Sequence, residues 1–268
     1  MKAIHELTKC LITVATLTTL VACADSGRDY VLVHGAWMGA WVWDDVAEPL
    51  ETDGHRVTVV ELPSHGSDTA LAADADLADY VARVEEAVSA AETPVRLVGH
   101  SMAGMVIAQV AENRPDDIEQ LVFVAAYLPR DGESLLDLAF QDADAITGQH
   151  LVFNEDGTVD VAADGIADVF CADCSAEALG RLAGELRAEP GHPLEEPVTL
   201  SDDNFGRVPR AYIKTLQDRA VSPALQTQML AATPVDRVIE FDTSHTPMLA
   251  APDELVAELG ATLDATDE

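Results

Sequence analysis

Positively charged side chains are scarce in this sequence. Of its 268 residues, 15 are Lys or Arg and 48 are Asp or Glu, which gives a formal net charge of −33 at pH 7. Such a surface repels the phosphates of nucleic acids and the headgroups of anionic lipids. The composition therefore argues against nucleic acid or an anionic lipid surface as an electrostatic partner.

The same excess of carboxylates predicts that salt stabilises the protein. Crowded like charges repel one another across the compact state, and dissolved ions screen that repulsion. We expect the melting temperature of the purified protein to rise between low and molar salt. A thermal melt that shows no rise would contradict this interpretation.

Cysteine is also scarce, and two of the four cysteines form the pair Cys171-Ala-Asp-Cys174. A zinc site would need two further ligands at a fitting spacing, and the sequence has no second C-x-x-C and no H-x₃-H. A thioredoxin-like redox site would open a helix early in a βαβ unit, whereas this pair lies in the middle of the chain. A local disulfide between Cys171 and Cys174 and two buried thiols both remain open.

Long apolar runs are missing as well. After a start that contains two lysines, CLITVATLTTLVA gives thirteen residues without a charge, which is short for a bilayer span. This layout is typical of a signal peptide, and Leu20-Val21-Ala22-Cys23 resembles a lipobox. We expect a signal peptide over 1–22, a lipid on Cys23, a short tether over 23–29, and an exported protein anchored at the cell envelope. The alternatives are an uncleaved N-terminal anchor helix and a run of small residues that ends in cysteine by chance.

In the rest of the chain, short apolar segments alternate with helical periodicities. The apolar segments are rich in Val, Ile and Leu and mostly continuous, as in a parallel sheet that is covered on both faces. The predicted strands are 30–34, 56–62, 95–99, 121–127, 210–216 and 237–241, and the predicted helices are 41–53, 74–91, 102–113, 222–232 and 252–263. This succession predicts an α/β fold with a doubly wound, mostly parallel sheet of about six strands.

The alternation stops between residues 129 and 207. This segment has acidic helical stretches, proline-punctuated helices, and a predicted hairpin with Asp156-Gly157 in its turn. Because it also contains large apolar residues such as Phe140 and Phe170, we interpret it as an inserted cap. The core then has two parts, 30–128 and 208–268.

Three side chains of complementary chemistry follow predicted strands. Ser101, Asp218 and His245 come after the third, fifth and sixth strands, and the carboxyl ends of parallel strands meet at one edge of a sheet. Serine, acid and histidine in this chain order are typical of α/β-hydrolase triads. His245 would take the proton of the weakly nucleophilic serine, and Asp218 would orient the imidazole. The amide of Met102 and the loop 35–37 would bind the oxyanion.

The motif around the serine is imperfect. It reads GHSMA, so Ala103 stands where the nucleophile elbow G-x-S-x-G has its last glycine. We interpret the position as requiring a small side chain, because the strand and the helix pack closely there. His34 and His100 also follow strands and are interpreted as packing or bonding locally, and His65 as a surface or rim residue.

Longer segments resemble a known family. HGAWMGAWVWDDV, VRLVGHSMAGM, RVPRAYIKTLQDRAV and SHTPMLAAPDEL look like the methylesterase and hydroxynitrile-lyase branch of the α/β-hydrolase superfamily, over about residues 30 to 263. The resemblance implies the triad Ser101, Asp218 and His245. It also implies oxyanion amides at Ala36 and Met102, and neither a metal nor an organic cofactor.

Two positions separate the esterase from the lyase chemistry within that resemblance. The lyases carry threonine at the position of Gly35 and lysine at the position of Thr246, where the lysine charge would stabilise cyanide as it leaves. The esterase-like members have glycine and an uncharged residue there. The resemblance therefore favours ester hydrolysis.

We accordingly expect a serine carboxylesterase that acts through an acyl-enzyme on small or medium apolar esters, methyl esters included. The expected partner is a small-molecule ester, and the oligomeric state is open. The alternatives are a hydroxynitrile lyase, C–C hydrolase or acyltransferase with the same triad, or an exported ligand-binding protein. The predicted pocket residues are Gly35, Trp37, Leu128, Phe140 and Thr246.

Overall fold

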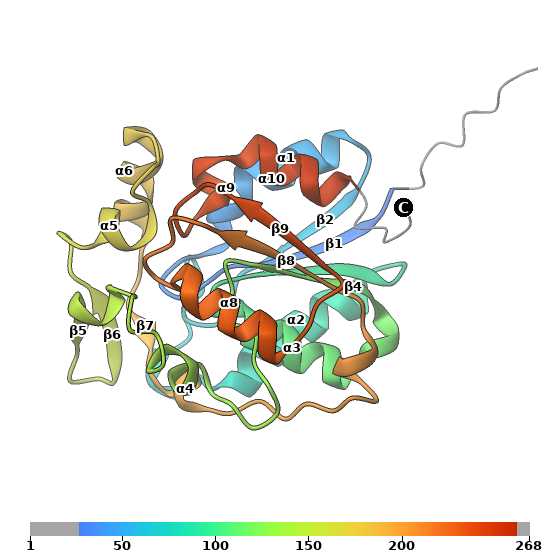
Figure 1. Ribbon diagram of the computed structural model, residues 1–268, viewed down its shortest axis with the longest axis horizontal. Helices are drawn as coiled ribbons and strands as arrows, with labels where there is room; N and C mark the ends of the chain where they lie inside the picture. The colour runs from blue at the N-terminus through green and yellow to red at the C-terminus, as the bar shows by residue number, and fades with distance from the viewer. Residues whose placement is uncertain (1–26, 262–268) are drawn as a thin grey trace, which may run out of the picture.

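The computed structural model describes residues 27–261, and a parallel sheet forms the centre of this part of the chain (Figure 1). Its strand order is β2-β1-β3-β4-β8-β9, and each neighbouring pair is parallel. The strands are β1 (Asp29–Val33), β2 (Arg56–Val60), β3 (Val95–His100), β4 (Ile118–Val124), β8 (Arg210–Thr215) and β9 (Arg237–Phe241). The prediction of a parallel six-stranded α/β sheet is confirmed.

Helices cover both faces of this sheet (Figure 1). Successive side chains of a strand point to opposite faces, so Val31 and Val33 of β1 join one core while Tyr30 and Leu32 join the other. The first core also contains side chains of α2 (Leu77–Ala90), α3 (Ala103–Asn113) and α8 (Pro223–Ala232). The second contains side chains of α1 (Asp44–Thr52) and α10 (Pro252–Gly260).

Some element ends differ from the prediction for local reasons. β4 ends at Val124 rather than 127, because Ala125 has a φ of 47° and leaves the extended conformation. α2 begins at Leu77 rather than 74, because the Asp76 side chain accepts a hydrogen bond from the Asp79 amide and caps the helix.

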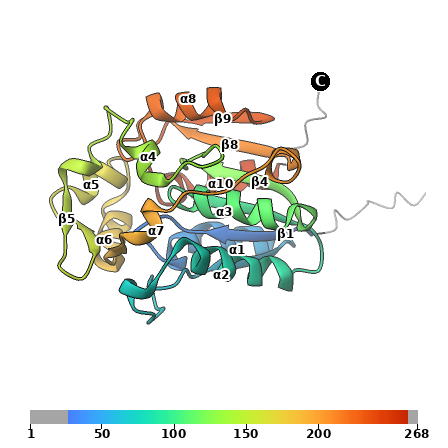
Figure 2. The ribbon, with the colours of Figure 1, turned by 90° about the horizontal axis from the view of Figure 1, so that it is seen from below.

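Within the segment 129–207, the elements from α4 to α7 lie beyond the carboxyl ends of the central strands, and the last residues run back along α3 to the start of β8 (Figures 1 and 2). The segment contains an antiparallel sheet in which the predicted hairpin supplies two strands. Its elements are α4 (Leu135–Ala139), β5 (Leu151–Phe153), β6 (Thr158–Val161), α5 (Ile166–Phe170), α6 (Ala176–Glu185), β7 (Glu189–Pro190) and α7 (His192–Glu195). We call this segment the cap. The predicted signal peptide over 1–22 and Cys23 lie outside the described residues.

Candidate functional site

Ser101 lies in the sharp turn that joins β3 to α3. Its φ of 55° falls in the left-handed region, which residues other than glycine rarely adopt. The Ser101 amide donates to the Val124 carbonyl at 3.2 Å, and the Ser101 carbonyl accepts from the amides of Gly104 and Tyr127, each at 3.1 Å. These bonds hold the strained turn and fix the serine at the edge of the sheet.

The neighbouring backbone comes closest to this turn at Gly104, and not at Ala103. A Cβ on Gly104 would lie 1.9 Å from the carbonyl oxygen of Tyr127. The side chain of Ala103, in contrast, is already buried in the packing between strand and helix. The glycine that this elbow requires therefore lies one residue later than the motif places it.

This geometry predicts unequal losses of stability for two single-methyl changes. Ala103→Gly should cost about 1–2 kcal/mol in the free energy of unfolding, from the low helix propensity of glycine and the loss of one buried methyl group. Gly104→Ala should cost about 3 kcal/mol or more, because a methyl group has to displace backbone atoms. Urea unfolding of both variants measures the difference, and equal costs would contradict this account of the turn.

His245 bridges Ser101 and Asp218. Its Nε2 lies 2.9 Å from the Ser101 Oγ, and its Nδ1 lies 2.8 Å from the Asp218 Oδ2. His245 and Asp218 are buried, and Ser101 is 7% exposed. With Nδ1–H donating to the carboxylate, the Nε2 lone pair accepts from the serine hydroxyl. The three predicted triad residues thus form one hydrogen-bonded chain, as their positions after β3, β8 and β9 predicted.

Donors from its own loop hold the Asp218 carboxylate. Its Oδ1 accepts from the amides of Ala220 at 2.8 Å and Val221 at 2.9 Å, and its Oδ2 accepts from the Thr215 hydroxyl at 2.8 Å. Charge-assisted hydrogen bonds of this kind compensate a buried carboxylate for lost hydration. They also fix the oxygen that receives His245 Nδ1–H.

Two further histidines lie behind the triad in the neutral form. Burial, and then the charge of His245, lowers the pKa of His100 well below its usual value, and the His100 Nε2 donates to the His245 carbonyl at 2.9 Å. Burial, and then the charge of His65, lowers the pKa of His34 to about 3. The His34 Nδ1–H donates to the Gly35 carbonyl at 2.9 Å. Both residues bond locally, as predicted.

The predicted oxyanion loop lies directly beside Ser101. A Cβ on Gly35 would lie 2.8 Å from the Ser101 Cβ, so glycine allows the loop to approach the nucleophile. The amide of Trp37 donates to the Glu189 carboxylate at 2.8 Å. Within the described residues, the amides of Ala36 and Met102 make no hydrogen bond. These two amides are therefore free to donate to a ligand.

Glu189 of β7 connects the cap to this loop. Besides the Trp37 amide, its carboxylate accepts from the His65 Nε2 at 2.7 Å and the Tyr80 hydroxyl at 3.2 Å, and both Glu189 and His65 are 0% exposed. Burial lowers the pKa of His65, but the charge and hydrogen bond of Glu189 outweigh it, so the net shift is upward. The prediction of a surface or rim position for His65 is wrong, because its partner lies 124 residues later in the sequence.

Two adjoining cavities lead to the serine. The inner cavity, about 40 Å³, is lined by Ala36, Trp37, Ser101, Met102, Tyr127, Leu135, Thr147, Phe170, Leu194, Ala220, Val221 and His245. The outer cavity, about 350 Å³, shares Trp37, Tyr127, Leu135, Thr147, Leu194 and Ala220 with the inner one, and its further lining includes Phe140 and Phe153. Its walls are mainly apolar.

Two of the five predicted pocket residues line these cavities. Trp37 lines both cavities, and Phe140 lines the outer one. Gly35, Leu128 and Thr246 line neither cavity, and Leu128 and Thr246 are buried. Thr147 and Leu194 could not be predicted as lining residues, because short cap segments carry no clear periodicity.

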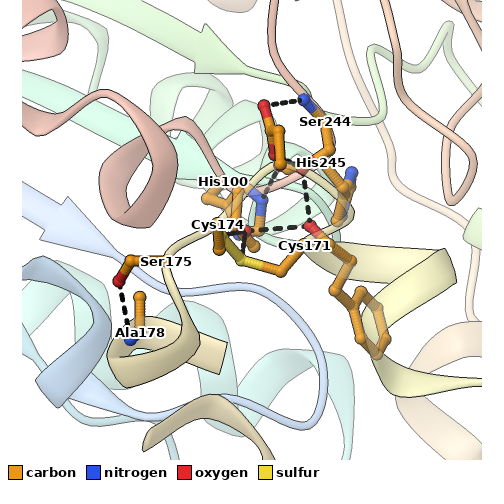
Figure 3. Close-up of a disulfide and its surroundings, with 10 residues drawn as sticks. His100, Cys171, Cys174, Ser175, Ala178, Ser244 and His245 are labelled. Carbon is orange, nitrogen blue, oxygen red and sulfur yellow. Dashed lines mark hydrogen bonds between the residues drawn. A yellow bond between two sulfur atoms is a disulfide. The ribbon is translucent and has the colours of Figure 1, made fainter. Parts of the chain in front are cut away.

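Cys171 and Cys174 form a disulfide in the turn between α5 and α6, close to His245 (Figure 3). Between residues 27 and 261, no group of three or more His, Cys, Asp or Glu side chains could hold a metal ion.

The fold agrees with comparisons to known proteins. Residues 30–259 match the family model described as the alpha/beta hydrolase family. Methylesterase 2 of Arabidopsis thaliana is 32% identical over 253 residues, which cover 88% of this chain and 96% of that protein. The chloroplastic methylesterase 11 of the same plant is 30% identical, and the chain spans 61% of its length. The crystal structure of polyneuridine aldehyde esterase superimposes with a TM-score of 0.79 at 26% identity and covers 90% of this chain and 100% of that one.

The chain therefore belongs to the alpha/beta hydrolase family, in its methylesterase and hydroxynitrile-lyase branch. It is a hydrolase of the carboxylesterase type.

The predicted localisation is wrong. The relatives are methylesterases of a plant, one of them chloroplastic, and this overturns the expectation of an exported protein that is lipid-anchored through Cys23. The expectation rested on charge and residue size in a short N-terminal stretch. Receptors recognise targeting signals of this kind from few residues, so a short stretch is weak evidence for localisation. Among the described helices, none is long and apolar enough to cross a membrane.

Proposed function

We propose that this hydrolase cleaves carboxylic esters through an acyl-enzyme on Ser101. The observation that carries the proposal is the buried chain from Ser101 Oγ through His245 to Asp218, with bonds of 2.9 and 2.8 Å. The Ser101 Oγ attacks the ester carbonyl carbon while the His245 Nε2 takes its proton. The C–O bond to the alcohol then breaks, and His245 returns the proton to the leaving oxygen. Water, activated by the same nitrogen, releases the acid and restores Ser101.

The amides of Ala36 and Met102 would stabilise the tetrahedral intermediate. Both border the inner cavity with Ser101, and within the described residues neither has a hydrogen-bond acceptor. A preorganised donor aimed at the developing oxyanion lowers a barrier of this kind by about 3 kcal/mol. Asp218 would stabilise the imidazolium that forms in the same step.

The cavities favour an uncharged ester with a small alcohol and an apolar acyl group. The inner cavity of about 40 Å³ has room for a methoxy group, whereas the apolar outer cavity of about 350 Å³ can hold an alkyl or aryl chain. Asp142 and Glu195 in the lining of the outer cavity would repel an anionic acyl group. The names of the methylesterase relatives agree with this choice.

Cyanohydrin cleavage receives less support. A leaving cyanide needs a cation nearby, and no lysine or arginine lines the inner or the outer cavity. The position after His245 carries Thr246, which is uncharged and buried.

A matched pair of methyl esters tests the proposed substrate class. We expect hydrolysis of methyl heptanoate, and a kcat/KM for monomethyl adipate that is lower by more than about tenfold, because the adipate carboxylate meets the acidic lining. Titration of released acid measures both rates. Equal rates would contradict the substrate class. No hydrolysis of any methyl or aryl ester, with cleavage of mandelonitrile instead, would contradict ester hydrolysis itself.

A further inference from the structure

One turn of the cap bonds to the residues on both sides of His245. The turn consists of residues 170–174, which run from the last residue of α5 toward the start of α6. On the N-terminal side of the histidine, the amide of Ser244 donates to the Asp173 Oδ2 at 2.9 Å, and the Ser244 hydroxyl donates to the Asp173 Oδ1. Ser244 is 2% exposed, whereas Asp173 is an exposed residue of the turn that reaches inward to it.

On the C-terminal side, the hydroxyl of Thr246 bonds to the same turn. It donates to the Phe170 carbonyl at 2.9 Å, and the Cys171 Sγ lies at the same distance from it. Thr246 is 0% exposed. The Phe170 ring lies against the imidazole, with 5.9 Å between the ring centroids. The turn thus bonds to the backbone or side chain of each neighbour of His245 and packs on its ring.

A disulfide cross-links this turn beside Thr246. Cys171 and Cys174 have their Cα atoms 5.2 Å apart, and the Cys174 Sγ lies 3.8 Å from the Thr246 hydroxyl. Figure 3 shows the sulfur–sulfur bond beside Ser244 and His245. The cross-link restricts the conformations of the turn, and Asp173 lies inside the loop that it closes.

We propose that this disulfide-closed turn is the positioning element that sets His245 against Ser101. Asp173 and the Cys171–Cys174 bond act through Ser244 and Thr246, and neither touches the substrate. The inference rests on the proposed function, in which the His245 Nε2 moves the proton of Ser101. A displacement of reacting groups by about 1 Å can cost about 100-fold in rate, so an enzyme without the intact turn should bind esters and turn them over slowly.

Substitutions of Asp173 test the carboxylate. Asp173→Ala should lower kcat about 10- to 100-fold and change KM by less than about threefold. Asp173→Asn should restore kcat to within about threefold of wild type, because its carbonyl still accepts from the Ser244 amide. Asp168→Ala is the matched control, since Asp168 lies on α5, is exposed, and faces Arg219 at 3.6 Å rather than the histidine. A wild-type kcat in Asp173→Ala would overturn the proposal, and so would equal losses in the Ala and Asn variants.

Reduction tests the cross-link. Dithiothreitol breaks the sulfur–sulfur bond, leaves a thiol on each cysteine, and is itself oxidised to a cyclic disulfide. The kcat of the wild-type enzyme should fall about 10- to 100-fold on reduction and return on reoxidation. Cys171→Ser/Cys174→Ser should have the low kcat and no response to dithiothreitol. Cys10→Ser/Cys23→Ser is the control and should respond like wild type.

Circular dichroism of each sample separates positioning from unfolding. The proposal expects the low kcat in protein that keeps its folded spectrum. Unchanged kcat after full reduction would overturn the proposal and leave the proposed function intact, and so would a loss of kcat that tracks loss of the folded spectrum. No esterase activity in the oxidised wild-type protein would instead overturn the proposed function.

Discussion

Ser101→Ala should lower kcat/KM for methyl heptanoate by about 10⁴- to 10⁶-fold. The hydroxyl is the atom that would form the acyl-enzyme, and serine enzymes that lose their nucleophile retain only the residual rate from oxyanion binding. Ser101 is the serine whose Oγ lies 2.9 Å from the His245 Nε2. Steady-state hydrolysis with purified protein measures the loss.

Ser89→Ala is the matched control for this change. Ser89 is exposed on α2, and its hydroxyl donates to the Glu85 carbonyl within the same helix, so its loss should leave kcat/KM unchanged. Circular dichroism should show both variants folded. If Ser101→Ala hydrolyses the ester at the wild-type rate, water or another group is the nucleophile and the acyl-enzyme mechanism is wrong.

Glu189→Ala should lower the free energy of unfolding by about 3–5 kcal/mol. The change leaves His65 buried without its carboxylate, and breaking one side of a buried ion pair has a cost of this size. The side chains of both partners are 0% exposed, and the carboxylate also accepts from the Trp37 amide in the oxyanion loop. Urea unfolding near neutral pH measures the change.

The stabilisation of the fold by the His65–Glu189 pair should decrease as pH rises. The pKa of His65 is raised above its ordinary value of 6.5, so the pair stabilises the fold fully below about pH 6.5 and loses this contribution as pH rises through the raised pKa. The difference in unfolding free energy between wild type and Glu189→Gln should therefore be largest near pH 6 and shrink toward alkaline pH.

Glu185→Gln serves as the control for both Glu189 predictions. Glu185 is an exposed carboxylate of the same cap, at the end of α6. Its loss should change the unfolding free energy by less than about 0.5 kcal/mol at any pH. A difference between wild type and Glu189→Gln that grows with rising pH would show that the pair is not ionic in the folded state.

Most of the central fold could be predicted because its signals are local. Most strands of the sheet are short segments rich in Val, Ile and Leu, and the order of serine, acid and histidine follows from where the strands end. The ends of elements could not be predicted, because they depend on contacts across the sheet. β2 stops at Val60, for example, and the amide of Leu62 then donates to the His34 Nε2 at 3.2 Å.

Most contacts that the cap makes in the site could not be predicted from the sequence. Nothing near His65 in the sequence indicates that Glu189 will pair with it, and nothing near His245 indicates that Asp173 will bind its neighbour Ser244. The elbow shows the same limit on a smaller scale. The motif places its glycine at 103, but the carbonyl of Tyr127, which determines where a side chain cannot fit, belongs to another strand's loop.

Labelling with a fluorophosphonate tests the central claim most directly. The reagent phosphonylates an activated serine, and mass spectrometry of the digested protein locates the adduct. We predict one adduct, on the peptide that contains Ser101, and its loss in Ser101→Ala and in His245→Ala. An active enzyme that carries no adduct on Ser101, or carries it on another serine, would contradict the assignment of Ser101 as the nucleophile.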